Sequence, residues 1–110
     1  NTGYFSSYEI QVILSMLRIL DNPLQDIPMA AVLASPIVGM DDEELAQIRS
    51  AFKGVSFAQA ALSAMAGENG YEDEKLKAFA LVFERLRGAV ADTPIHELLY
   101  MMLDETGFYR

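Results

Sequence analysis

Gly3-Tyr4-Phe5-Ser6-Ser7-Tyr8-Glu9-Ile10 leads into an almost wholly apolar run over 11–20, which Asp21-Asn22-Pro23 ends. Ser6 and Glu9 have the spacing of a capping box, in which hydroxyl and carboxylate oxygens accept hydrogen bonds from backbone N–H groups of the first turn. Pro23 disfavours helical geometry at the preceding residue. These signals predict a helix over 11–20. Because a helix that is apolar nearly all round is usually buried on several sides, we expect it to be the central helix of the domain.

Capping and stop signals predict further helices along the chain. Asp26 is expected to cap a short helix that runs through Ser35 and ends at Pro36. Asp41 and Glu44 form a second capping box before a helix over 42–52, and Ser56 precedes a helix that Gly67 closes.

The remaining helices are expected over 72–90 and 94–105. In the last of these we expect Thr93 as the N-cap and Pro94 in the first turn. Its inward-facing residues are expected to be Ile95, Leu98, Leu99 and Met102. Alternating strand patterns are nearly absent, so the sequence predicts an all-α fold, an orthogonal array of about six helices.

Composition limits the class of protein. The 110 residues make one domain or a piece of one, and the hydrophobic fraction of 52% favours a packed core. No apolar run approaches the ~20 residues that cross a bilayer, and no secretory signal pattern is visible. Cysteine is absent, which fits a reducing compartment, so we expect a cytoplasmic protein without a membrane partner. The chain starts at Asn1, and we interpret it as excised from a longer protein.

The net charge of −8 argues against a free-standing nucleic-acid-binding protein, which normally presents a basic face. Lys75, Lys77, Arg85 and Arg87 fall in one predicted helix. At ~100° per residue they spread around it, so we interpret them as a solvated helix surface.

Catalytic and metal-binding patterns are not evident. His96 is the only histidine, no cysteine is present, and neither GxxxxGK[ST] nor GxGxxG occurs. The acidic run Asp41-Asp42-Glu43-Glu44 is explained by the preference of carboxylates for the positive end of a helix. The sequence therefore predicts no catalytic, cofactor-binding or metal-binding residue in this chain.

One motif resembles a known family. Tyr4-Phe5-x-x-x-Glu9-Ile10, followed by Leu14, Leu17, Arg18 and Asn22-Pro23, resembles the aromatic–aromatic-x-x-x-acidic-aliphatic motif of UvrD-like superfamily 1 helicases. In that family the motif lies where the second RecA-like motor subdomain continues into a helical insertion, the 2B subdomain. The resemblance implies that residues 1–9 are a junction and 10–110 the insertion. Tyr4, Phe5, Glu9 and Ile10 would then have a structural or coupling role.

The continuation is similar to the AddA (RexA) helicase–nuclease protein of Gram-positive bacteria. The similar segments are Asp21-Asn22-Pro23-Leu24-Gln25-Asp26-Ile27-Pro28, Ala31-Val32-Leu33, Ser35-Pro36-Ile37-Val38-Gly39, Glu43-Glu44-Leu45, Pro94-Ile95-His96-Glu97-Leu98-Leu99 and Glu105-Thr106-Gly107-Phe108-Tyr109. Ser35, Pro36 and Gly39 mark a family-like loop. Simpler UvrD-type helicases often carry a basic residue where Ser7 stands, so the contact made there is not carried over.

The resemblance implies a role in the repair and recombination of double-strand breaks. AddA pairs with AddB, and together they unwind and resect DNA ends with ATP and a magnesium-dependent nuclease domain. ATP and magnesium are thus implied for the parent protein. The implied partners are the motor subdomains of the same polypeptide, an AddB-like subunit, and DNA through the parent protein.

Two other classes of function remain open. A stand-alone helical adaptor would bind a protein through apolar segments such as Ile37-Val38 and Met40. A small helical enzyme would use His96 and carboxylates.

Overall fold

The computed structural model describes residues 5–107, and over that range it contains six α-helices, two short 3₁₀ turns and no strand. The α-helices are α1 (Ser7–Asp21), α2 (Asp26–Ala34), α3 (Asp42–Ala51), α4 (Phe57–Met65), α5 (Glu74–Ala89) and α6 (Ile95–Thr106). The 3₁₀ turns are η1 (Glu68–Gly70) and η2 (Val90–Asp92). The predicted all-α class is confirmed. Within 5–107, no helix combines the length and apolar character needed to cross a bilayer.

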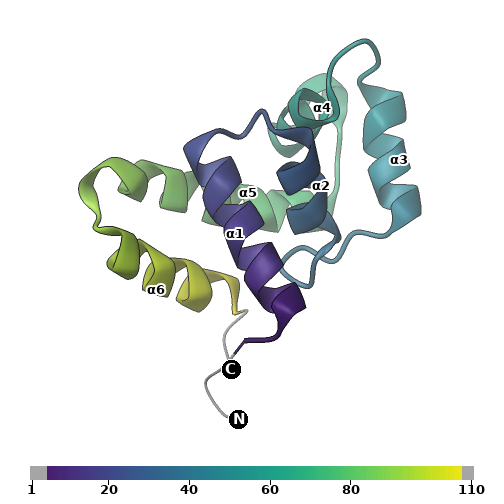
Figure 1. The fold of residues 1–110 in the computed structure, drawn as a ribbon. Helices are drawn as coiled ribbons and strands as arrows, with labels where there is room; N and C mark the ends of the chain where they lie inside the picture. The colour runs from purple at the N-terminus through teal and green to yellow at the C-terminus, as the bar shows by residue number, and fades with distance from the viewer. Residues whose placement is uncertain (1–4, 108–110) are drawn as a thin grey trace.

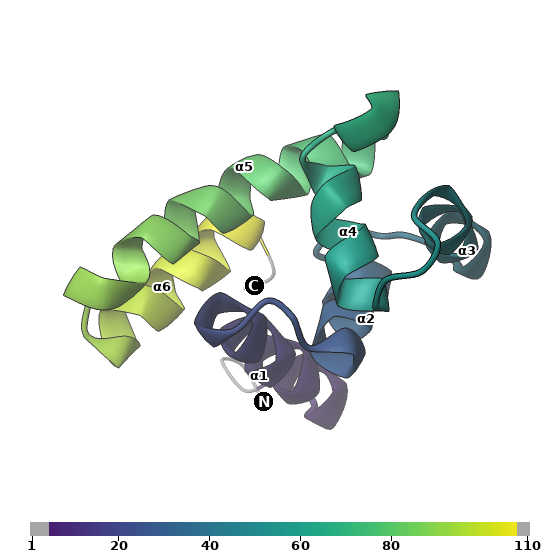
Figure 2. The ribbon, with the colours of Figure 1, turned by 90° about the horizontal axis from the view of Figure 1, so that it is seen from above.

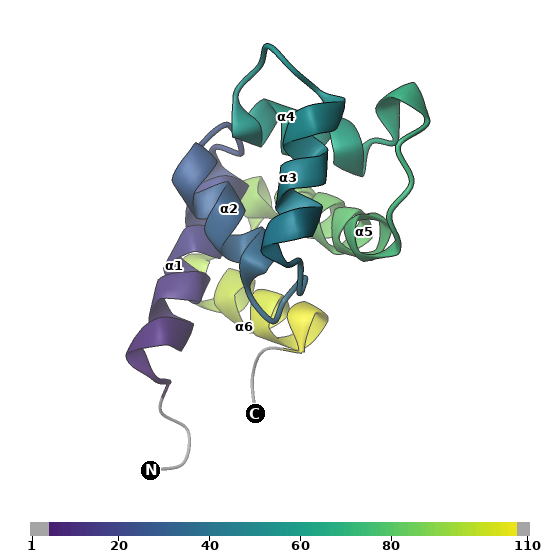
Figure 3. The same cartoon turned by 90° about the vertical axis from the view of Figure 1, so that its right-hand side faces the viewer.

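Helix α1 lies between two groups of helices (Figures 1 and 2). On one side α5 and α6 run next to each other, and on the other side α2, α3 and α4 pack together (Figure 3). The core between them is built mainly from fully buried aliphatic side chains, including Met16, Ile19, Met29, Leu33, Ile48, Leu76 and Leu86.

The first helix has the predicted capping box but begins at Ser7, four residues before the predicted start at residue 11. Ser6 Oγ accepts a hydrogen bond from the Glu9 N–H (3.1 Å), and Glu9 Oε1 accepts one from the Ser6 N–H (2.8 Å). This is a complete capping box, and the helix ends before Asn22. Predicted burial on several sides is wrong, however, because Ile10 is 45% exposed and Leu14 is 38% exposed. Neighbouring helices cover only the side of α1 that carries Val12, Met16 and Ile19.

Asp26 does not cap its own helix. Gln25 occupies the N-cap position of α2 without a side-chain cap, and Asp26 lies in the first turn. The Asp26 carboxylate instead accepts a hydrogen bond from the Ala58 N–H (2.9 Å), in the first turn of α4. A carboxylate there satisfies an orphan donor and lies at the positive end of α4. Asp26 therefore links the starts of α2 and α4.

The α3 capping box between Asp41 and Glu44 is present as predicted. Helix α5 begins two residues later than predicted because Asp73 is its N-cap and accepts a hydrogen bond from the Leu76 N–H (3.0 Å).

The start of α6 differs from the prediction. Pro94 is the N-cap residue, with extended ψ, and not a first-turn residue. Thr93 therefore lies one position too early to cap the helix. Ile95 is 64% exposed, so the prediction that it faces inward is wrong. No neighbouring helix covers the first turn of α6, whereas Leu98 and Met102 in later turns are buried.

We predict that Asp26→Ala lowers the free energy of unfolding by about 0.5–2 kcal/mol, the usual effect of removing a capping acceptor. Asp26→Asn keeps a side-chain oxygen and should lose less. Urea unfolding followed by circular dichroism measures both. Equal stability of Asp26→Ala and the parent chain would contradict the capping role.

Candidate functional site

One side of α1 presents apolar side chains that the neighbouring helices leave exposed or only half-buried. Ile10, Leu14 and Leu17 follow one another at intervals of four and three residues, which places them on one side of a helix. Ile10 and Leu14 are exposed, and Leu17 is half-buried at the edge of the core. We call these three residues the α1 stripe. Because helices usually bury such a row, it is the first candidate for a contact surface.

The other predicted junction residues have different surroundings. Tyr4 lies outside the described residues. Phe5 is half-buried and packs against the core. The Glu9 carboxylate turns back to the Ser6 N–H in the capping box. Glu9 and Phe5 therefore hold the start of α1, while Ile10 faces outward from it.

The predicted family-like loop is a compact turn after α2. Ser35 is fully buried, and its hydroxyl donates to the Val32 carbonyl (2.7 Å) and accepts from the Ile37 N–H (3.2 Å). The Gly39 N–H donates to the Ser35 carbonyl (2.7 Å). Gly39 has φ +81°, a left-handed conformation that favours glycine. Pro36, whose ring presets φ for a turn, is exposed between them. These contacts bring Ser35 and Gly39 together.

Lys75 on α5 reaches this turn. Its Nζ donates to the Gly39 carbonyl (2.8 Å) and to Glu44 Oε1 (2.9 Å). Glu44 also accepts from the Asp41 N–H in its capping box (2.9 Å). One lysine thus joins the turn, the start of α3 and α5. Sequence reasoning missed this contact because its members are 31 and 36 residues apart, with no local pattern that pairs them.

The contact changes the titration of both charged groups. The hydrogen bond from the Asp41 backbone, followed by the hydrogen bond from Lys75, lowers the pKa of Glu44. The hydrogen bond to Glu44 raises the pKa of Lys75. Both side chains are partly exposed, so salt screens their attraction.

The other basic residues of α5 also have partners. Lys77 pairs with Glu72 (3.1 Å), and Arg85 pairs with Glu105 on α6. Arg87 Nη1 donates to the Leu20 carbonyl at the end of α1 (2.7 Å). The interpretation of these cations as an exposed helix surface is confirmed, because all four are exposed. Lys75, Arg85 and Arg87 also make contacts with other segments that the sequence did not predict. These three side chains hold α5 to other helices, which argues against a phosphate-binding patch.

The remaining candidates for chemistry are dispersed. His96 is exposed in the first turn of α6. Within residues 5–107, histidine, aspartate and glutamate side chains form no group of three that could hold a metal ion.

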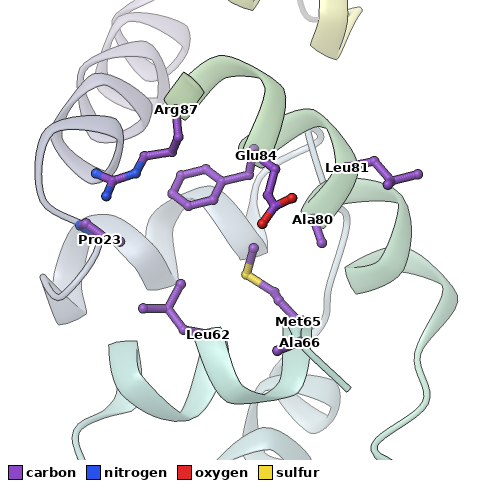
Figure 4. Close-up of a pocket in the computed structure, with 9 residues that line it drawn as sticks. Pro23, Leu62, Met65, Ala66, Ala80, Leu81, Glu84 and Arg87 are labelled. Atoms are coloured by element: carbon purple, nitrogen blue, oxygen red, sulfur yellow. The ribbon is translucent and has the colours of Figure 1, made fainter. Parts of the chain in front are cut away.

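A hollow of about 450 Å³ lies between the α1–α2 connection, α4 and α5 (Figure 4). No sequence motif indicated it, because its walls come from three separate parts of the chain.

We predict a pH-dependent contribution of Glu44 to stability. A carboxyl whose pKa is lowered on folding stabilises the fold above its unfolded pKa, and this contribution is lost as pH falls through the folded pKa. Glu44→Gln keeps the capping geometry but removes the charge. Relative to the parent chain, it should therefore be least stable at about pH 6 to 9, and the difference should shrink below about pH 4.

Urea unfolding midpoints across this pH range measure the difference. Glu43→Gln is the control, because Glu43 is exposed on the same helix and forms no ion pair with Lys75 among the described residues. A pH-independent difference between Glu44→Gln and the parent chain would contradict the prediction.

No protein-family model matches the chain. Curated relatives do match, and each is named as the A subunit of an ATP-dependent helicase/nuclease. The protein of Anoxybacillus flavithermus is 43% identical over 99% of this chain, and that of Bacillus cytotoxicus is 42% identical over 98%. The protein of Bacillus mycoides is 38% identical over 98% of this chain. The chain spans 9% of the length of each of these relatives.

The resemblance found in the sequence is therefore confirmed along nearly the whole chain. It includes the capping box of α1 and the turn after α2, so both regions lie within the similar segment. We conclude that this chain is homologous to one segment of the A subunits of ATP-dependent helicase/nucleases.

Proposed function

We propose that this chain is a non-catalytic helical subdomain of an ATP-dependent DNA helicase and exonuclease of the AddA type, which acts in double-strand break repair and recombination. The similarity to helicase/nuclease proteins over 98–99% of the chain supports the family part of this proposal. The observation that supports the subdomain role is the α1 stripe, in which Ile10 and Leu14 are exposed close to the start of α1.

The α1 stripe suits a contact with the motor part of the same polypeptide. Ile10 and Leu14 would lose their exposure to water in such a contact, and burial of apolar surface contributes about 25 cal/mol per Å². The Ser6–Glu9 capping box fixes the direction in which the chain enters α1, and ends of elements such as this one are common hinge positions.

The positions of the first and last helices fit an insertion in a longer protein. The start of α1 and the end of α6 lie on the same side of the molecule (Figures 1 and 3). An insertion with ends on one side joins a host domain without rearrangement of either fold. The proposed partners are therefore the motor subdomains, an AddB-like subunit, and DNA through the parent protein, all in the cytoplasm.

ATP and magnesium belong to the proposed parent protein. The residues of this chain do not fit them, because the sequence has no phosphate-binding glycine loop and residues 5–107 have no group that could hold a metal. We assign no step of the reaction to side chains of this chain.

We predict that polar substitution of the α1 stripe uncouples ATP hydrolysis from unwinding. A chimera of the Anoxybacillus flavithermus protein would carry this chain in place of its own matching segment. Ile10→Gln with Leu14→Gln should leave ATP hydrolysis on single-stranded DNA within about twofold of the unsubstituted chimera, since the motor is untouched. Duplex unwinding should fall about tenfold, which corresponds to ~1.4 kcal/mol of lost contact energy.

Ile27→Gln is the matched control, because Ile27 is 85% exposed on α2 and lies outside the stripe. In the isolated chain, both variants should change the free energy of unfolding by less than about 0.5 kcal/mol. Normal unwinding by the stripe variant would overturn the proposed contact.

We further predict that the isolated chain binds duplex DNA only weakly. Its charge of −8 repels phosphate, and the cations of α5 are already paired. Fluorescence anisotropy with a labelled duplex at physiological salt measures this. Binding at about micromolar concentration would show that the chain itself holds DNA.

A further inference from the structure

The hollow between the α1–α2 connection, α4 and α5 is apolar over most of its wall. Its apolar lining comes from Pro23, Leu62, Met65, Ala66, Ala80, Leu81 and Phe83. Its volume of about 450 Å³ lies in the range of ~300–1,000 Å³ typical of ligand-binding clefts. Leu81 on its rim is 68% exposed, which is unusual because an exposed helix position more often carries a charged residue. The hollow is therefore large enough, and apolar enough, to receive side chains of a partner.

Two charged residues line the hollow, and only one is engaged. Arg87 donates to the Leu20 carbonyl (2.7 Å) and, more weakly, to the Asp21 carbonyl (3.4 Å). Within residues 5–107, the Glu84 carboxylate forms no hydrogen bond or ion pair. In Figure 4 its carboxylate projects over the hollow, above Met65. The hollow thus combines apolar walls with the Arg87 cation, which is held on carbonyls of α1, and the Glu84 carboxylate, which has no partner within residues 5–107.

We propose that this hollow docks a protein segment that inserts an arginine or lysine flanked by apolar side chains, with the cationic group paired to Glu84. The aliphatic stem of such a residue packs on apolar walls while its head reaches a carboxylate. Met65 is flexible and adapts to the inserted chain. Arginine among apolar neighbours is a common anchor of protein interfaces.

Charge favours this occupant over others. The net charge of −8 steers basic partners towards the chain and repels acidic ones. A nucleic acid would bring phosphate oxygens towards the Glu84 carboxylate, which is unfavourable. We therefore expect the pairing of the Glu84 carboxylate with an arginine or lysine of the partner to determine which partner binds.

This docking site is separate from the α1 stripe. Pro23 follows the last turn of α1, so the hollow lies at the opposite end of that helix from Ser6 and residue 5 (Figure 1). A partner in the hollow would bind next to the last turn of α1, whereas a contact through Ile10 and Leu14 would lie nearer its start. The proposal does not depend on the α1 stripe, so each can fail alone.

The test uses two amphipathic helical peptides that are identical except for one central residue. One has arginine there and the other has citrulline, its neutral isostere. Each is titrated into the isotopically labelled 110-residue chain, and amide chemical shifts give the site and the Kd. We expect shifts around Leu62, Met65 and Leu81. We also expect the arginine peptide to bind about three- to tenfold more tightly, as a partly exposed charge-assisted hydrogen bond provides.

Glu84→Gln should remove this preference, and Glu97→Gln should keep it, because Glu97 is an exposed carboxylate on α6 away from the hollow. Equal affinity for the two peptides would overturn the proposal. So would shifts that map to the α1 stripe, absence of binding at about millimolar peptide, or a hollow already filled by self-association, seen as concentration-dependent shifts without peptide.

Discussion

The packing of one side of α1 against α2 and α5 is the interaction on which the rest of this structure depends. Met16 and Ile19 have no exposed surface, and they meet core residues from both groups of helices. Helix α1 packs against α2 and against α5, and α4 also packs directly against α5. Because tightly packed interiors tolerate little change in volume, this side of α1 fixes how the two groups sit. Its opposite side remains free for another role.

Hydrogen bonds between distant segments complete that arrangement. Asp26 satisfies the start of α4, Lys75 holds the turn at Gly39, and Arg87 satisfies the last carbonyls of α1. Each contact supplies a partner for backbone groups that a helix end or a turn leaves open. They add specificity more than energy, because most of these charges are exposed and screened. The result is a packed group of helices in which most charged residues of α5 contact other parts of the chain.

Two surfaces remain for partners, and they differ in chemistry. The α1 stripe is purely apolar and adjoins the start of the chain's first helix, which suits a permanent contact inside one polypeptide. The hollow at α4 and α5 has an unpaired carboxylate among apolar walls, which suits a basic partner. The chain is homologous to one segment of ATP-dependent helicase/nuclease proteins, and under the proposed function both surfaces would contact other parts of such a protein or its partners.

The sequence by itself determined the helices, because their signals are local. The capping boxes of Ser6 with Glu9 and of Asp41 with Glu44 act over three residues, and Pro23 and Gly107 end helices through their own backbone preferences. It also carried the family motif. Only the tertiary structure decided that Ile10 is exposed and that Asp26 caps the start of α4. It also decided that Lys75 binds Gly39 and Glu44, that Arg87 binds the end of α1, and that Glu84 has no partner within residues 5–107. These outcomes depend on which helices become neighbours, and the partners lie 31 to 67 residues apart in the chain, beyond the reach of any local pattern.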